Sequence, residues 1–336
     1  MAWRKKDPHV WGEVVIQPGQ ELDAEVPISE SYCGRKVSFP VHIKRGTAPG
    51  PTVFVTAAVH GDELNGTAAI RSLIFDPEVQ LRCGTLILVP VVNVLGFETH
   101  SRYLPDRRDL NRCFPGSANG SQASRLARVV FDEIVGRSDF GIDLHTAAIR
   151  RTNFPNVRGD LGNANVRQLA EAFGCEILVD EIGPEGSFRR SATDAGCPTI
   201  ILEAGEVWKM EQPIVDVTRR GIKNVLQHLE MLGGVRQSRL QFNVVEKTQW
   251  IRADHAGFVE FHCELGSRVR EGQNLATITT LLGRNPVTLV APMDSIVLGL
   301  TTLPVTTPGE PICHLGQVRF QPAMLRTAVI RLTDAA

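Results

Sequence analysis

The sequence predicts an α/β fold: a mixed, mostly parallel sheet flanked by helices, with a C-terminal all-β domain. From about residue 36 to 232, apolar strand-like runs alternate with amphipathic stretches, a pattern typical of parallel sheets covered by helices on both faces. After residue 240 the composition changes to short β-like runs separated by Gly and Pro turns. The sequence therefore predicts two domains, 1–235 with a short N-terminal β extension and 240–336.

Each element of the first domain follows from its local pattern. The runs expected to form strands are 36–43, 51–59, 85–93, 140–145, 175–179 and 198–206. The stretches with helical spacing are 65–75, 122–137, 163–174, 187–196 and 213–232. The last helix should begin at Pro213, which suits a first helical position, and end before Gly233. In such sheets, ligands bind beyond the carboxyl ends of the strands.

Charge and cysteine content narrow the class of protein. The chain has 36 basic and 37 acidic residues, which argues against nucleic acid or a membrane surface as the main partner. No apolar stretch reaches the length of a membrane span, and the N-terminal residues lack the apolar region of a signal peptide. The seven cysteines are scattered without a C-x-x-C pair, so we expect a reducing, cytoplasmic setting.

Polar side chains that can bind a metal stand at the ends of strand-like runs. His60 follows an apolar run in VFVTAAVHGDELNG, and Glu63 comes three residues later, with Gly61 between them to allow a sharp bend. His145 and Glu203 end two later runs. Imidazole and carboxylate groups are the ligands of catalytic zinc, which keeps one position open. His145 is the natural third ligand.

An H-x-x-E pair alone is weak support, since it occurs often by chance and a histidine at a strand end is often only a polar surface residue. The conjunction of motifs is stronger. VHGDELNG, RDLNRCFPG, DLHTA and ILEAGE follow in this order, each at a strand end or in a loop. None has an obvious structural need for so many charged groups, so together they favour a catalytic site.

These motifs resemble the succinylglutamate desuccinylase/aspartoacylase family, within the wider zinc carboxypeptidase superfamily, from about residue 36 to the C-terminus. The resemblance implies a zinc-carboxypeptidase-like fold with one Zn²⁺ per chain. Its H-G-x-E motif supplies two ligands, here His60 and Glu63, and a later strand supplies His145. It also implies that Asp109, in DLNR, hydrogen-bonds the zinc-bound His60.

The same resemblance assigns roles toward the substrate. It implies that Asn111 and Arg112 hold the substrate carboxylate and that Arg102, in SRYLPD, polarises the scissile carbonyl. Glu203, in IILEAG, corresponds to the general base. A planar guanidinium fits a carboxylate better than lysine does, and a glutamate beside a zinc-activated water can take its proton and pass it to the leaving nitrogen.

A further substrate arginine of the family corresponds to Arg190 in FRRS. The gap from Arg190 to Glu203 is longer here than in aspartoacylase, so Arg189 is the alternative. Asp143, two residues before His145, is a second candidate to hold an imidazole, because alternate residues of a strand share a face. The stretch RYLPDRRDLNRCFPG also carries an insertion relative to aspartoacylase, so the substrate can differ from those of both named enzymes.

The C-terminal region contains two similar segments, 256–278 and 291–315. A β repeat of this size resembles the two halves of a biotinyl/lipoyl-like barrel-sandwich domain. No lysine follows Lys247, which excludes covalent attachment of biotin or lipoate in this region. By resemblance, this domain narrows the entrance to the zinc site, although a role in forming a homo-oligomer is equally open.

Two classes of zinc hydrolase compete as the function, and both use the same chemistry. The first is an amidohydrolase, a deacylase that removes an acyl group from a small N-acyl amino acid. The second is a metallocarboxypeptidase that trims peptides. The C-terminal domain and the set of arginines favour the first, with a small anionic substrate. A third interpretation, a catalytically silent scaffold, is disfavoured because the metal ligands and the base are all retained.

Overall fold

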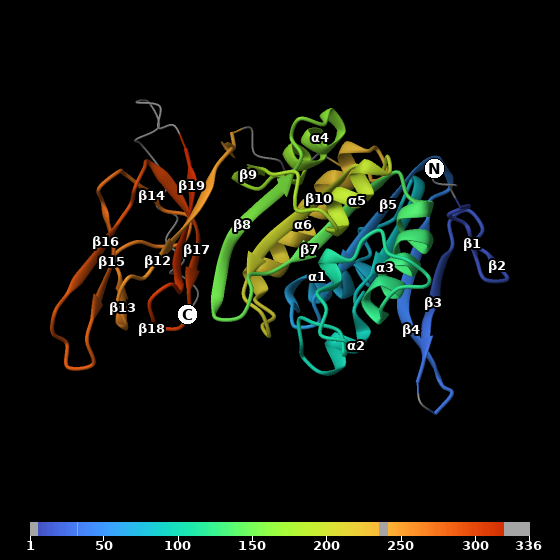
Figure 1. Cartoon of the computed structure of the whole chain (residues 1–336). Helices are drawn as coiled ribbons and strands as arrows, with labels where there is room; N and C mark the ends of the chain where they lie inside the picture. Colours follow the sequence, from blue (N-terminus) through green and yellow to red (C-terminus); the bar gives the residue numbers. More distant parts are fainter. Residues whose placement is uncertain (1–5, 32, 235–240, 319–336) are drawn as a thin grey trace.

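The computed structural model describes residues 6–31, 33–234 and 241–318, and shows a large mixed sheet with helices on both faces (Figure 1). Its α-helices are α1 (Asn65–Ile74), α2 (Val94–Glu98), α3 (Gln122–Glu133), α4 (Ala164–Phe173), α5 (Phe188–Asp194) and α6 (Gln212–His228), and two short 3-10 helices are η1 (Leu110–Arg112) and η2 (Val135–Arg137). None of the described helices has the length and hydropathy needed to cross a membrane.

The main sheet runs in the order β12-β19-β17-β8-β10-β7-β5-β6-β4-β3. These strands are β12 (Thr248–Arg252), β19 (Pro311–Gln317), β17 (Ser295–Thr301), β8 (Arg151–Gly159), β10 (Thr199–Gly205), β7 (Phe140–His145), β5 (Ala48–Ala57), β6 (Cys83–Val89), β4 (Lys36–Arg45) and β3 (Glu21–Glu30). Its four central strands, β10, β7, β5 and β6, are parallel, and the strands on either side of them along this path pair antiparallel.

The smaller strands lie at the margins. Attached to the main sheet are β9 (Ile177–Asp180), β11 (Asn243–Val245) and β14 (Arg268–Val269). A separate four-stranded sheet contains β16 (Val287–Val290), β15 (Asn274–Thr279), β13 (Gly257–Phe261) and β18 (Val305–Thr306), and an N-terminal hairpin contains β1 (Val10–Trp11) and β2 (Val14–Val15).

The strands alternate between two apolar layers, as a pleated backbone requires. Helices α1, α4 and α6 cover one face of the sheet, where Ile142 and Leu144 of β7 belong to the same apolar cluster. Helices α3 and α5 cover the other face, where Phe54 of β5 belongs to their cluster. Because Ile142 and Leu144 face the first layer, the intervening residues Asp143 and His145 must face the side of α5. The sheet thus delivers its polar side chains to one face at the carboxyl ends of β7 and β10.

Strand β8 is an element that the sequence pattern does not predict. Its nine residues include Asn153, Pro155, Asn156 and Arg158, and this polar composition hides the alternation of a strand. β8 pairs with β10 on one side and with β17 on the other, both antiparallel, so C-terminal strands continue the main sheet (Figure 1). The predicted domain boundary at 235–240 lies outside the described residues, and the division stays a prediction.

One buried ion-pair cluster joins the helices α1 and α6. Asp76 follows α1, and its carboxylate lies 2.6 Å from Lys223 Nζ and 2.9 Å from Arg219 Nη2. Although burial opposes ionisation, hydrogen bonds from Lys223 and Arg219 lower the pKa of Asp76 to about 2. A carboxyl group whose pKa is lowered by folding stabilises the fold above its unfolded pKa, and this contribution is lost as the pH falls toward 2.

Asp76→Asn is therefore expected to lower the free energy of unfolding by about 1 to 2 kcal/mol at pH 7. Chemical denaturation of both proteins from pH 7 down to pH 2 measures the difference. It should shrink below about pH 4, where the carboxyl group of the unfolded chain becomes protonated. A difference that stays constant over this range would mean that the ion pairs do not produce the effect.

Candidate functional site

The turn between β5 and α1 carries the first two predicted ligands. Glu63 N donates to His60 O at 3.2 Å, so the two side chains leave one tight turn. The sequence predicts a sharp bend at Gly61, but the φ of this residue is not positive. Glycine is needed here for another reason: a Cβ atom would lie 2.1 Å from the backbone carbon of Gly96. Close packing of two chain segments therefore holds this turn in place.

The parallel pairing of β7 and β10 places His145 beside Glu203. The two residues are direct partners in the register of the strands, so their side chains emerge on the same face. They end strands that are far apart in the sequence but adjacent in the sheet. This is the convergence of strand ends that the sequence predicted.

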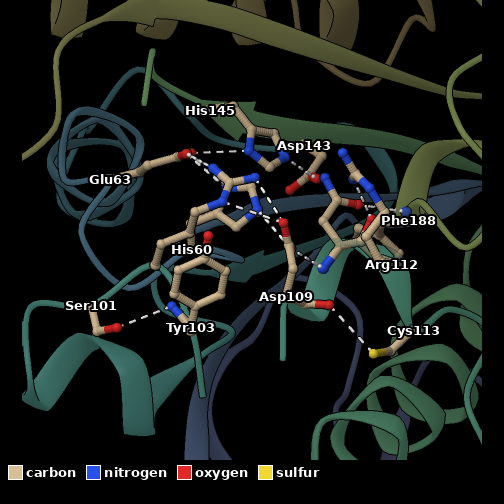
Figure 2. A network of polar contacts seen from close by, with 12 residues as sticks. His60, Glu63, Ser101, Tyr103, Asp109, Arg112, Cys113, Asp143, His145 and Phe188 are labelled. Carbon is tan, nitrogen blue, oxygen red and sulfur yellow. Dashed lines mark hydrogen bonds and ion pairs between the residues drawn. The ribbon is translucent and has the colours of Figure 1, made fainter. Parts of the chain in front are cut away.

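His60, Glu63 and His145 form a compact buried cluster (Figure 2). His60 Nδ1 lies 2.7 Å from Glu63 Oε1, and His145 Nδ1 lies 2.9 Å from Glu63 Oε2. One ligand atom from each of the three residues lies within 4.8 Å of the others. The carboxylate of Glu63 thus stands between two imidazole rings, each of which presents its Nδ1 atom to it.

The opposite side of each ring is held by an aspartate. His60 Nε2 lies 3.1 Å from Asp109 Oδ1, and His145 Nε2 lies 2.7 Å from Asp143 Oδ2. Asp143 is fully buried and also accepts a hydrogen bond from Thr56 Oγ1 at 2.7 Å. Carboxylates in this position orient metal-binding imidazoles, because an Nε2–H held outward leaves Nδ1 as the free donor atom.

The electrostatics of the cluster favour a bound cation. Burial disfavours charged imidazoles, yet the neighbouring carboxylates raise the pKa of His60 and raise that of His145 well above its ordinary value. Burial likewise opposes ionisation of Glu63, but the two imidazoles hold its pKa far below the usual range. Two nitrogen donors and a buried carboxylate match the donor set of zinc in catalytic sites. The residues therefore fit a zinc ion.

Arg102 lies at the edge of this cluster. Its Nη2 donates to Asp109 Oδ2 at 2.9 Å, and its Nη1 lies 3.6 Å from Glu63 Oε1. Burial would lower the pKa of Arg102, but Asp109 and Glu63 raise it, so the guanidinium stays charged. A fixed positive charge is thus present beside the cluster.

Asn111 and Arg112 border the same cavity from η1. Asn111 Oδ1 accepts a hydrogen bond from Phe188 N at 2.8 Å, which ties η1 to the start of α5 and leaves the amide N–H groups of Asn111 available to the cavity. Arg112 Nη1 donates to the backbone oxygen of Asn111, and no carboxylate among the described residues pairs with Arg112. Its guanidinium is therefore available to an anion.

The two consecutive arginines of α5 diverge. Arg190 points away from the cavity: it donates to Gly183 O at 3.3 Å and lies 3.7 Å from Asp194. Arg189 lines the cavity, is only 7% exposed, and lies 3.2 Å from Glu181 Oε2. Successive side chains of a helix diverge by about 100°. Only one of the pair can face inward, and it is Arg189.

Asn153 contacts the candidate base, a role that no sequence motif indicates. Asn153 Nδ2 donates to Glu203 Oε2 at 3.0 Å. The register pairs Glu203 with Asn156 and Gly205 with Asn153, so β8 holds one more residue than β10 between these pairs. Such a β-bulge redirects the following side chains, here bringing Asn153 to the face of the cavity. Nothing in the sequence marks β8, so no pattern could have identified this residue.

One cavity of about 230 Å³ is lined by the three members of the cluster, the candidate base and the polar residues around them: His60, Glu63, His145, Glu203, Arg102, Asn111, Arg112, Asn153 and Arg189. Asp109, Asp143 and Arg190 do not line it. The C-terminal strands supply part of its wall through Trp250 and His314. The remaining lining residues come from the ends of β7, β8 and β10 and from the loops around η1 and α5. A metal cluster, a carboxylate and several guanidinium groups therefore share one small polar cavity.

Comparison with known proteins agrees with this geometry. Residues 49–229 match the family model described as the succinylglutamate desuccinylase/aspartoacylase catalytic domain. The chain is 28% identical over 311 residues to an N-alpha-acetyl-L-2,4-diaminobutyric acid deacetylase of Halomonas elongata, covering 88% of this chain and 90% of that protein.

Two solved structures show the same fold. A succinylglutamate desuccinylase/aspartoacylase from Rhodobacter sphaeroides has a TM-score of 0.77 at 27% identity, over 89% of this chain and 96% of that chain. The product-bound ectoine utilization protein EutE (DoeB) from Ruegeria pomeroyi has a TM-score of 0.79 at 23% identity, over 94% and 100% of the two chains. With the family match covering more than half of its length, this chain belongs to the succinylglutamate desuccinylase/aspartoacylase family.

Proposed function

We propose that the chain is a zinc-dependent amidohydrolase that removes the acyl group from a small N-acyl amino acid. The observation that carries this proposal is the buried cluster of His60, Glu63 and His145 beside Glu203 in one cavity. One zinc ion per chain would be held by these three side chains. When bound, zinc acts as a Lewis acid and makes water a better nucleophile at neutral pH.

The other roles follow from where the side chains lie. Glu203 takes the proton of the attacking water and delivers it to the leaving nitrogen. Arg102 stabilises the negative charge that develops on the carbonyl oxygen, an effect that commonly contributes about 3 to 4 kcal/mol per donor. Asn111 and Arg112 bind the substrate carboxylate. Since Arg190 points to the surface, Arg189 takes its place as the further arginine of the cavity.

The size of the cavity supports deacylation over peptide trimming. At about 230 Å³ it falls below the roughly 300–1,000 Å³ of common ligand sites. Trp250 and His314 form part of its wall, where a peptide substrate would need space. The relative from Halomonas elongata is named as a deacetylase of an N-acetylated amino acid, which agrees with a substrate of this kind.

Metal analysis and a substrate panel test this proposal. We expect about one zinc per chain by mass spectrometry, and hydrolysis of at least one acetyl or succinyl amino acid that stops on chelation and returns with zinc. Release of C-terminal residues from peptides, without deacylation, would favour the carboxypeptidase instead. Full zinc occupancy without turnover of any substrate would favour the silent scaffold.

The proposal also covers the C-terminal residues and the cellular setting of the protein. The C-terminal residues contribute antiparallel strands, and we propose that 241–318 belong to a biotinyl/lipoyl-like module without an attachment lysine, which limits access to the cavity. The rest of the predicted domain 240–336 lies outside the described residues. We also propose the reducing cytoplasm as the setting of the protein, in which its seven cysteines remain thiols.

A further inference from the structure

The cavity extends past Glu203 into a region that no recognised motif covers. We propose that Arg151, Arg158, Trp250 and His314, together called the distal subsite, bind a second carboxylate of the substrate, remote from the scissile amide. The preferred substrate then carries one carboxylate for Arg112 and another for this subsite. This inference rests on the proposed function, which identifies the ligand of the cavity as an N-acyl amino acid.

The sheet places the distal subsite next to the base. Across the strands, Asn153 on β8 pairs with Gly299 on β17, Gly299 pairs with His314 on β19, and His314 pairs with Trp250 on β12. Asn153 also contacts Glu203 at 3.0 Å. One continuous row of residues therefore leads from the base to the C-terminal strands, along the face that forms the cavity.

Gly299 lets the neighbouring strands of this row approach closely. A Cβ atom at this position would lie 2.8 Å from Asn153 Oδ1 and 3.5 Å from His314 Cβ. A side chain here would displace Asn153, so the glycine allows Asn153, beside Glu203, and His314 to line the same cavity. The bulge in β8 adds a second effect, because it turns Arg151 as well as Asn153 to the cavity.

The distal subsite has a positive charge that is only partly compensated. Arg151 stacks over the Trp250 ring at 5.0 Å and forms no ion pair with any residue in the described ranges. Arg158 donates from Nε to Asn156 Oδ1 at 2.9 Å, and its nearest carboxylate, on Glu181, is 3.6 Å away and 46% exposed. Two guanidinium groups with free N–H donors suit a carboxylate and repel an ammonium group.

His314 completes the subsite as a neutral donor and acceptor. His314 is 5% exposed, and its ring stacks on Trp250 with a centroid distance of 4.5 Å and an interplanar angle of 5°. Burial, together with the charges of Arg158 and Arg151, lowers the pKa of His314 to about 3. The imidazole is therefore neutral at pH 7 and can donate one hydrogen bond to a ligand without a charge of its own.

Calorimetric titration of the zinc-loaded Glu203→Gln protein tests the subsite, because this protein binds without turnover. One matched pair, N-acetyl-L-glutamate and N-acetyl-L-glutamine, places the second charge on the amino acid. Another, N-succinyl-L-alanine and its terminal amide, places it on the acyl group. In at least one pair we expect the ligand with the second carboxylate to bind about tenfold or more tightly than its amide partner. We expect Nα-acetyl-L-ornithine to bind more weakly than either member of the first pair.

Adding Arg151→Gln should bring that ratio to within about threefold of one, with little effect on the amide ligand. Arg150→Gln is the matched control, since Arg150 is adjacent in sequence but does not line the cavity, and it should keep the full ratio. Arg158→Gln provides a second removal of charge. Melting temperatures of all variants show whether the fold is kept.

The outcomes separate the subsite from the proposed function. No preference for the carboxylate in either pair, or a preference that survives both arginine substitutions, would overturn the subsite. Charge-dependent binding without turnover of any substrate by the unmodified enzyme would overturn the proposed function and leave the subsite standing. Turnover without charge preference would do the reverse, and no binding of any ligand would contradict both.

Discussion

Replacement of Glu203 with glutamine is expected to lower kcat by about 10²- to 10⁴-fold and to leave the zinc content unchanged. Glu203 lies beside the metal cluster but is not one of its three members. Glutamine has the same shape and can still accept the hydrogen bond from Asn153 Nδ2, so the wall of the cavity should stay intact. What disappears is the group that accepts a proton from water and returns it to the leaving nitrogen.

Steady-state kinetics on the best substrate, with metal analysis of the same samples, measure this effect. Glu206→Gln is the matched control, because Glu206 follows the same strand but bonds to Thr302 and Lys209 outside the cavity. That variant should retain kcat within a few-fold. If Glu203→Gln retained activity comparable to that of the control, the base would have to be another residue.

Substitution of Glu63 with glutamine is expected to abolish zinc binding and, with it, turnover. Glu63 contacts both imidazoles and is 2% exposed, so it supplies the buried negative charge that stands between them. Loss of an outer partner of a ligand commonly weakens zinc about 10- to 100-fold, and loss of a ligand itself should exceed that. Competition with a chromogenic chelator measures the affinity directly.

Asp109→Asn gives the graded comparison. Asp109 holds His60 from the far side of the ring, so this variant should weaken zinc by about 10- to 100-fold and remain rescuable by added metal. Near-native zinc affinity in Glu63→Gln, in a protein with an unchanged melting temperature, would remove Glu63 from the metal site. Equal losses of zinc affinity in the two variants would contradict the assignment of Glu63 as a ligand and of Asp109 as a partner of the ligand His60.

His60 and His145 could be predicted from the sequence because each ends an apolar run, and Glu63 because it follows His60 at the H-x-x-E spacing. A buried strand of a parallel sheet is a continuous apolar segment, so a histidine or glutamate at its tip is conspicuous. The rule that strand ends meet at one edge then brings His60, His145 and Glu203 together without any coordinates. The structure adds the register that makes His145 and Glu203 direct neighbours.

The distal side of the cavity could not be predicted in this way. β8 contains a proline, two asparagines and a bulge, and none of these produces a period of two in hydrophobicity. Without a predicted strand, the sequence could not indicate that Arg151, Asn153 and Arg158 lie at the cavity. Trp250 and His314 reach the cavity only because C-terminal strands extend the same sheet, a contact between regions about 100 to 150 residues apart that local patterns do not encode.

The choice between Arg189 and Arg190 also depends on structure. Both belong to the predicted helix, and the family motif favours Arg190 because a serine follows it. The phase of α5 is set by Phe188, which is fully buried against Phe54 and Phe114. Once Phe188 faces the core, the next residue lines the cavity and Arg190 turns to the surface.

Anomalous diffraction at the zinc absorption edge, from crystals of the purified enzyme, tests the central claim most directly. We expect one strong peak per chain at about 2.0 to 2.2 Å from His60 Nδ1, His145 Nδ1 and an oxygen of Glu63. No peak at this position in crystals grown with zinc, or a peak held by other side chains, would contradict the assignment of the metal site on which the proposed hydrolysis depends.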